Sequence, residues 1–267
     1  MKYSIFESGS KGNCTLIESE GRYLLIDAGI SKKKLKAKLE QIGKTMEDIN
    51  HVLITHNHSD HISGIDAFPK EMLYSTYEVL YSIYKVLYPT YATLPDIPLA
   101  NQLIPYQTYR INGFDVLVIP TSHDTDGSVG FSIGDGKETL VYVTDTGYLY
   151  EKSVDLIGNA DYYIFESNHN VKALIESDRP QSLKKRIMGD YGHLSNEDSA
   201  NYLCDVVGEK TREIVLAHLS EEVNSPELAL ADLMKVFKKR GVDFDRFRIR
   251  CASQTETVSG GEDFVRI

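Results

Sequence analysis

The segment from Thr55 to His61, Thr-His-Asn-His-Ser-Asp-His, gathers three imidazoles and one carboxylate within a few residues. It follows the run His51-Val-Leu-Ile-Thr55, whose apolar centre predicts a buried β-strand that ends where the histidines begin. Packing alone rarely places so many titratable side chains at a strand end, whereas imidazole and carboxylate groups are common ligands of divalent metal ions. The chain must therefore fold so that a metal site forms at the carboxyl edge of a sheet.

The spacing of the four side chains indicates two metal ions rather than one. His56 and His58 lie two residues apart directly after the predicted strand, so both imidazoles can point in the same direction. Asp60 and His61 follow at the expected start of a helix, where consecutive side chains diverge and can face a second ion.

Three residues farther along the chain complete the expected ligand set: His123, Asp145 and His218. Each alone would more often be an ordinary polar or turn residue, but the histidine cluster changes that expectation. Zinc-like catalytic sites use three protein ligands and keep an open position for water. We therefore expect a three-histidine site of His56, His58 and His123, and a mixed site of Asp60, His61 and His218. Asp145, which follows a predicted strand, would bridge the ions, and zinc, manganese and iron all suit such ligands.

Short apolar runs and turn signals predict an alternation of strands and helices. Strands are expected at residues 3–6, 15–17, 23–26, 51–55, 115–119, 129–133, 139–143, 162–165 and 213–216. Helices are expected at residues 32–41, 77–88, 196–207 and 226–239, with Ser195 and Ser225 as caps. The first three strands would form an antiparallel meander. This order predicts an α/β chain with two mixed sheets covered by helices, and the lack of a Pro/Gly/Ser-rich linker predicts one domain over residues 1–267.

Composition narrows the possible partners. A formal net charge of −10 argues against a protein that binds nucleic acid through the electrostatic field of the whole molecule. A local basic path at residues 32–38 or 184–186 stays open, and a solvated helix face is the alternative explanation of these stretches. The start of the chain lacks the apolar core of a signal peptide, and no run of about 18 apolar residues predicts a membrane span. Cys14, Cys204 and Cys251 are widely spaced and predict free thiols. We expect a cytoplasmic protein without a membrane partner.

Five segments resemble the motifs of the metallo-β-lactamase superfamily. They are Leu24-Leu-Ile-Asp27-Ala-Gly29, His56-x-His58-x-Asp60-His61, Ser122-His123, Asp145 and Ala217-His218. The resemblance implies a four-layer αββα sandwich and two divalent metal ions. It also implies that Asp27 supports the ligands through hydrogen bonds rather than binding metal itself.

Three further segments resemble a bacterial branch of that superfamily whose members are named YycJ, VicX or WalJ. They are Ser8-Gly-Ser-Lys-Gly-Asn-Cys14, Glu166-Ser-Asn-His169 and Gly192-His-Leu-Ser-Asn196. Members of this branch are associated with a DNA exonuclease activity from the 5′ end and with a sensor-regulator operon. The resemblance implies DNA as the partner, with RNA as an open alternative, and it leaves the oligomeric state open.

Six residues in these segments are candidate substrate contacts: Ser10, Asn13, Glu166, Asn168, His193 and Ser195. His193 and Ser195 precede a predicted helix, whose free N–H groups favour a phosphate oxygen, although His193 could equally close a turn. The loop from Ser8 to Asn13 allows close backbone approach to a ligand, and a simple glycine-rich turn is the alternative.

A tyrosine series also has three explanations. Tyr77, Tyr81, Tyr84 and Tyr88 recur at spacings that place them on one helical face. Such a face serves packing more often than base stacking or a subunit contact.

The chemistry expected of two adjacent cations is hydrolysis. They acidify a water molecule, bind a non-bridging oxygen and stabilise charge during in-line attack on a phosphodiester. Asp60 is expected to be the catalytic carboxylate that orients a hydroxide held between the metals. The sequence thus predicts a binuclear metal-dependent phosphodiesterase, and the resemblance implies that it is a 5′-to-3′ DNA exonuclease.

Two other functions stay open. One is a hydrolase of small esters, thioesters or lactones, against which the lack of a clear thiol-carrier-binding helical region after His218 weighs modestly. The other is a non-enzymatic regulatory partner of a two-component system. A complete ligand set argues against it, because a purely structural role does not need an open two-metal centre.

Overall fold

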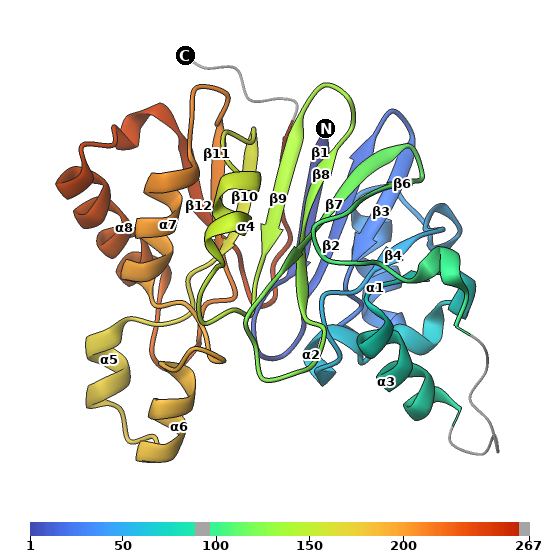
Figure 1. Cartoon of the computed structure of the whole chain (residues 1–267), viewed down its shortest axis with the longest axis horizontal. Helices are drawn as coiled ribbons and strands as arrows, with labels where there is room; N and C mark the ends of the chain where they lie inside the picture. The colour runs from blue at the N-terminus through green and yellow to red at the C-terminus, as the bar shows by residue number, and fades with distance from the viewer. Residues whose placement is uncertain (89–96, 262–267) are drawn as a thin grey trace.

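The computed structural model describes residues 1–88 and 97–261, and in this part of the chain two β-sheets pack face to face with helices on their outer sides (Figure 1). The first sheet has the order β13-β1-β2-β3-β4-β5. Its strands are β1 (Lys2–Glu7), β2 (Cys14–Ser19), β3 (Arg22–Ile26), β4 (Val52–Leu53), β5 (Leu73–Tyr74) and β13 (Val258–Gly261). Strands β1, β2 and β3 form the predicted antiparallel meander, and β4 and β5 run parallel to β3.

The second sheet has the order β12-β11-β10-β9-β8-β7-β6. Its strands are β6 (Thr108–Ile111), β7 (Phe114–Pro120), β8 (Val129–Gly134), β9 (Thr139–Val143), β10 (Tyr162–Glu166), β11 (Glu213–Ala217) and β12 (Arg248–Cys251). Strands β6 to β9 are antiparallel, whereas β9 to β12 are parallel. Because parallel neighbours end at the same edge of a sheet, the residues that follow β9, β10 and β11 are brought together.

The helices form the outer layers and one edge. They are α1 (Lys32–Gln41), α2 (Ser59–Ile62), α3 (Tyr77–Leu87), α4 (Glu151–Leu156), α5 (Val171–Glu176), α6 (Gln181–Ile187), α7 (Asn196–Val206) and α8 (Pro226–Arg240). Short 3₁₀ turns lie at Met46–Asp48, Ile65–Ala67, Lys70–Met72, Leu99–Asn101 and Phe244–Arg246. Figure 1 shows α2, α5 and α6 below the sheets, at the edge where the ligands are expected. Within the described ranges, none of the helices is long and apolar enough to span a membrane.

Alternating side chains build the layers. Leu24 and Ile26 of β3 face the other sheet, whereas Leu25 between them packs under α1 and α3. In β9, Leu140 and Tyr142 face the sheet interface, and Val141 and Val143 pack under α7 and α8. Successive side chains of a strand point to opposite faces of the sheet, so both sets are buried only when another layer covers each face. The predicted αββα sandwich is thereby confirmed.

Strand β4 is shorter than predicted. The sequence predicts a strand over residues 51–55, but the ladder contains only Val52–Leu53. The reason lies at Thr55, whose backbone N–H donates to Oδ1 of Asp27 at 2.8 Å instead of continuing the ladder. The chain therefore leaves the sheet just before the histidine cluster.

The predicted helix ends are confirmed where polar caps exist. Oγ of Ser195 accepts the N–H of Asp198 at the start of α7, and Oγ of Ser225 accepts the N–H of Leu228 at the start of α8. Helix α8 ends at Arg240, and the next residue, Gly241, has the left-handed φ of +72° typical of a helix C-terminus.

The tyrosine series on α3 divides into two parts. Tyr84 is fully buried and its hydroxyl donates to the Lys70 carbonyl at 3.2 Å, as expected of a packing residue. Tyr77 and Tyr81 are about half exposed, and their rings stack with centroids 5.9 Å apart. The four side chains therefore do not share a single environment.

Candidate metal centre

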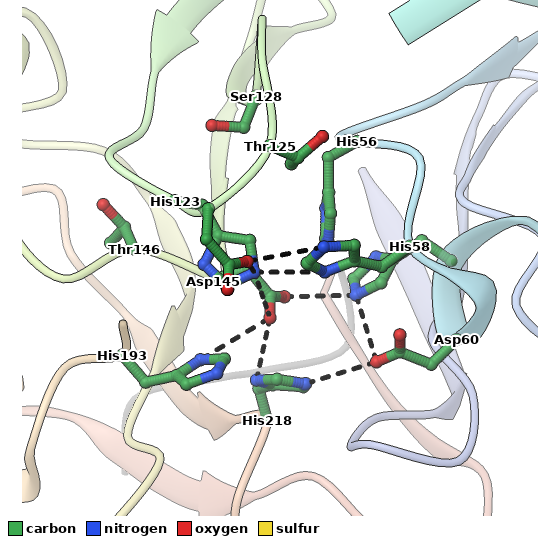
Figure 2. Close-up of polar contacts among 12 residues, drawn as sticks. His56, His58, Asp60, His123, Thr125, Ser128, Asp145, Thr146, His193 and His218 are labelled. Carbon is green, nitrogen blue, oxygen red and sulfur yellow. Dashed lines mark hydrogen bonds and ion pairs between the residues drawn. The ribbon is translucent and has the colours of Figure 1, made fainter. Parts of the chain in front are cut away.

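The seven predicted ligands gather in one cluster at an edge of the two sheets. Figure 2 labels all of them except His61. His56 and His58 follow β4, and Asp60 and His61 lie in α2. The remaining three ligands each follow a strand of the second sheet: His123 after β7, Asp145 after β9 and His218 after β11. Both sheets thus contribute side chains to one cluster.

The two predicted sites are each brought together. Ligand atoms within 4.8 Å of one another join His56, His58 and His123 in one group, and Asp60, His61 and His218 in another. Asp145 lies between the groups: Oδ2 is 3.2 Å from Nε2 of His61, and Oδ1 is 3.8 Å from Nε2 of His123. This arrangement matches the predicted bridging position, and metal binding itself stays a prediction.

Three residues at this edge have a left-handed backbone. The φ angles are +58° at Asp27, +57° at Asp145 and +56° at His218, each one or two residues after a buried strand. Residues other than glycine rarely adopt this conformation, which costs about 1 kcal/mol or more. Strain of this kind is retained where a side chain must be aimed, here toward the cluster.

Asp27 lies behind His61 as the resemblance implied. Its Oδ2 accepts from Nδ1 of His61 at 2.8 Å, and Thr55 donates to the same carboxylate from its backbone N–H and its hydroxyl. Asp27 and His61 are completely buried. With Nδ1 held by Asp27, the imidazole presents Nε2 to the cluster, which is the arrangement seen for metal-binding histidines.

Glu166, a predicted substrate contact, performs the same task behind His218. Oε1 accepts from Nδ1 of His218 at 3.0 Å and from Nδ1 of His193 at 2.8 Å. Oε2 accepts the backbone N–H groups of Thr146 and Leu194. The side chain is fully buried and both oxygens accept hydrogen bonds, so it positions histidines, and a direct contact with substrate stays a prediction.

Asn13 and Asn168 are also buried, and both contact residues of the centre. Nδ2 of Asn13 lies 2.9 Å from Nε2 of His61 and 3.3 Å from Oδ2 of Asp60. Nδ2 of Asn168 donates to the carbonyl of His218 at 2.9 Å. These amides fix the backbone and side chains of the mixed site, and a direct contact of either with substrate stays a prediction.

The other candidate substrate contacts lie in different environments. Ser10 is exposed at the tip of the loop between β1 and β2. Ser195 is buried, and its hydroxyl both accepts from the N–H of Asp198 and donates to Oδ2 of the same residue, so it has a capping role. His193 lies in the centre: its side chain is 20% exposed, and its Nδ1 is 3.6 Å from Oδ1 of Asp145. In Figure 2, His193 and His218 point toward Asp145 from the same side.

Asp60 is held in place by the backbone of two other segments, the Ser8–Cys14 loop and the Leu24–Gly29 motif. The carbonyl of Asp60 accepts the N–H of Asn13 at 2.7 Å, and a Cβ atom on Gly29 would lie 1.7 Å from the same oxygen. Only glycine therefore permits α2 to approach this segment. Oδ2 of Asp60 lies 3.8 Å from Nε2 of His218, and the side chain is 20% exposed, so it borders the open side of the mixed site.

The buried carboxylates and imidazoles of the centre shift one another's pKa. Burial would raise the pKa of Asp145, but His218 and His61 hold it well below its usual range. Burial likewise opposes ionisation of Glu166, yet His193 and His218 lower its pKa to about 2. The pKa of His61 is raised to about 10 because Asp27 and Asp145 outweigh its burial. Buried carboxylates thus stay charged because the neighbouring imidazoles carry balancing positive charge.

Two buried nitrogens have an unmet bonding capacity that a metal ion would satisfy. Among the described residues, Nε2 of His56 and Nε2 of His218 have no hydrogen-bond partner. A buried polar atom without a partner costs about 1–3 kcal/mol, so such atoms usually have a ligand in the working protein. The donor set of imidazoles and carboxylates fits zinc, manganese or iron.

The predicted basic stretches are partly internal. Lys184 is buried, and its Nζ donates to the carbonyls of Ile175 and Ser177. Lys34 forms an ion pair with Glu7 at 2.7 Å. Arg186 pairs with Asp124, the residue after His123, and so lies beside the three-histidine site.

Comparisons with known proteins agree with this architecture. The model of the metallo-beta-lactamase superfamily matches residues 8–218. A Streptococcus pneumoniae protein named exodeoxyribonuclease WalJ is 34% identical over 91% of this chain and 92% of its own length. A Bacillus anthracis protein named exodeoxyribonuclease YycJ is 31% identical over 90% of both chains.

A solved structure shows the same fold at lower identity. The metallo-beta-lactamase fold protein YhfI from Bacillus subtilis superposes with a TM-score of 0.68 at 20% identity, over 97% of this chain and 99% of that one. The family motifs, the αββα layers and the relatives that align along nearly the whole chain lead to one assignment. The chain belongs to the metallo-β-lactamase superfamily, and it is similar along most of its length to the relatives named WalJ and YycJ.

Proposed function

We propose that this chain is a DNA exonuclease that uses two divalent metal ions and degrades DNA from the 5′ end. The observation that carries the proposal is the position of Asp145 between the three-histidine site and the mixed site. The names of the relatives support a deoxyribonuclease rather than a small-molecule hydrolase. The three-histidine site of His56, His58 and His123 would hold one ion, and the mixed site of Asp60, His61 and His218 the other.

Bound there, the two ions would acidify a water molecule and neutralise the charge that develops on the phosphodiester. The residues of the chain supply orientation and proton acceptance. Asp60 borders the open side of the mixed site and is placed to accept a hydrogen bond from the attacking water. Asp27 and Glu166 keep Nε2 of His61 and the ring of His218 turned toward the centre.

His193 is the residue best placed to assist departure of the cleaved strand. Glu166 accepts its Nδ1–H at 2.8 Å, which leaves Nε2 available to a phosphate oxygen or to the leaving oxygen. Its partial exposure lets solvent exchange protons with the ring. An imidazole oriented by a buried carboxylate is a common general acid.

The test is digestion of end-labelled DNA and RNA, single- and double-stranded, with Mn²⁺, Zn²⁺ and Mg²⁺ compared. Attack from the 5′ end shortens 3′-labelled duplex DNA progressively and releases the label of 5′-labelled DNA at once. His58→Ala and Asp60→Ala should abolish digestion, whereas His51→Ala and Asp66→Ala, which change the same residue types away from the ligand groups, should not. Release of mononucleotides from the 3′ end would contradict the polarity. Selective thioester or lactone hydrolysis would favour the small-molecule alternative, and a metal-loaded chain without any hydrolytic activity would favour the regulatory one.

A further inference from the structure

The connection between α6 and α7 joins the metal centre to an exposed aromatic side chain. Gly192 offers its carbonyl to Nδ1 of His123 at 3.1 Å, and the next residue, His193, bonds to Glu166. Tyr191, directly before them, is 66% exposed. Two residues of chain span only about 7 Å, so Tyr191 lies at the rim of the centre.

This connection is held firmly in place. The N–H of His193 donates to the carbonyl of Ile187 at 2.9 Å, and the N–H of Gly192 to that of Gly189 at 2.8 Å. The hydroxyl of Ser122, next to His123, donates to the carbonyl of Asp190 at 2.7 Å. The backbone that presents Tyr191 is therefore fixed relative to the ligands.

A second aromatic segment packs against the first. The N–H of Gly147 donates to the carbonyl of Ser122 at 2.8 Å, and a Cβ atom on Gly147 would lie 2.2 Å from the carbonyl oxygen of Asp190. Tyr148 and Tyr150 follow immediately, with ring centroids 5.1 Å apart, and Tyr150 is 40% exposed. The hydrogen bond with Tyr148 and partial burial raise the pKa of Tyr150 to about 12, and Tyr191 is close enough to add to this shift.

A fixed cation completes the rim on the side of the three-histidine site. Nε of Arg186 donates to Oδ2 of Asp124 at 2.6 Å, while Oδ1 of Asp124 lies 3.4 Å from Nε2 of His58 and 3.5 Å from Nε2 of His123. The Arg186 side chain is nevertheless 59% exposed. Its guanidinium is thus anchored by one carboxylate and still has donors for another anion.

The chemistry of this rim fits one class of partner. Exposed tyrosine rings offer faces on which unpaired bases stack, and an anchored guanidinium binds phosphate in a fixed geometry. The chain has a net charge of −10, and Glu151 and Asp190 are exposed near these tyrosines, so attraction by overall charge is weak here. Contacts with bases are then needed to hold a strand. Bases in a duplex are covered by their neighbours, which leaves single-stranded nucleic acid.

We propose that Tyr148, Tyr150 and Tyr191 form a stacking surface for unpaired bases adjoining the scissile phosphodiester, and that Arg186 binds a neighbouring phosphate. The inference rests on the proposed function for the position of the scissile bond. It predicts that the strand enters the centre unpaired, over the rim formed by the segments 146–150 and 186–193.

The test measures binding separately from cleavage. Fluorescence anisotropy with chelator present follows a labelled oligothymidylate and an abasic strand of equal length. The wild type should bind the strand with bases more tightly. Tyr150→Ala/Tyr191→Ala should weaken its binding by about tenfold or more and remove the difference between the strands, because each stacked base contributes a measurable share. Tyr150→Phe/Tyr191→Phe should retain the difference in affinity between the two strands. Arg186→Ala should weaken the binding of both strands by the same factor.

The matched control is Tyr77→Ala/Tyr81→Ala, which removes the exposed, stacked pair on α3. Equal binding of the two strands by the wild type would overturn the inference, as would an equal loss in this control. The inference would also fail if the Tyr150 and Tyr191 substitutions changed the oligomeric state in size-exclusion chromatography and left oligonucleotide binding intact. Thermal unfolding of each variant identifies loss of fold. A chain that binds strands as expected but cleaves no DNA would contradict the proposed function alone.

Discussion

Oε1 of Glu166 lies 3.0 Å from Nδ1 of His218, at the end of the second sheet, and both side chains are buried. The first sheet repeats this relationship, since Oδ2 of Asp27 lies 2.8 Å from Nδ1 of His61. Each sheet therefore supplies one carboxylate that orients one histidine of the mixed site. The centre depends on residues that themselves need not touch a metal ion.

Glu166→Gln should lower metal affinity by about 10- to 100-fold, the usual effect of removing a hydrogen-bonding partner of a metal-binding histidine. The amide keeps the size of the side chain but loses the charge that holds His218 and His193. Competition with a chromophoric chelator measures the affinity. Glu176→Gln, on the exposed surface of α5, is the control and should bind metal as the wild type does. Unchanged affinity in Glu166→Gln would contradict the supporting role of Glu166.

Metal removal should reduce thermal stability. A ligand present at 100 times its dissociation constant stabilises the folded state by about 2.7 kcal/mol. For a chain of this size that corresponds to about 5–10 °C in Tm. Differential scanning fluorimetry of the chelated and metal-loaded chain measures the shift, and elemental analysis should give two ions per chain. His56→Ala should retain fewer ions and show a smaller shift. A Tm independent of metal would contradict two occupied sites.

Gly147→Ala should destabilise the fold, because the new methyl group would lie 2.2 Å from the carbonyl oxygen of Asp190. Backbone must move to relieve this contact, and overpacking of this kind costs about 1–3 kcal/mol. Urea unfolding measures the change in free energy. Gly158→Ala is the control, since its methyl group would meet only the Asp155 carbonyl at an ordinary 3.7 Å. Equal stability of the two variants would show that the segments 146–148 and 189–190 do not pack as described.

Much of the architecture could be predicted because short apolar runs end directly at polar residues. Thr139–Val143 matches its predicted strand, and the residues after β9 and β11 are the expected Asp145 and His218. Helix α1 has the predicted bounds as well. These features are local: the strand period, the helix period and the polar residue at the strand end all lie within one segment of sequence.

The missed features depend on contacts between distant segments. Strand β12, Arg248–Cys251, alternates two arginines with apolar residues and is only partly buried, because it forms a sheet edge. Helices α5 and α6 are short and depend on contacts such as those from Lys184 to the end of α5. The role of Glu166 was also hidden. Its partners Thr146, Leu194 and His218 come from three other segments, and an acidic residue at a strand end has the same appearance whether it meets substrate or a buried histidine.

Ser195, a predicted substrate contact, caps a helix in the structure, and the two roles can be tested separately. Its hydroxyl caps α7, so Ser195→Ala should cost about 1 kcal/mol in the free energy of unfolding, the usual value for a lost helix cap. Ser225→Ala removes the equivalent cap of α8, away from the centre, and should cost a similar amount. Urea unfolding gives both stabilities, and steady-state digestion gives KM and kcat for DNA. If Ser195 acts only as a cap, KM should be the same in the two variants. A KM raised several-fold in Ser195→Ala alone would show that its hydroxyl, or the helix start that it holds, contacts the substrate phosphate after all.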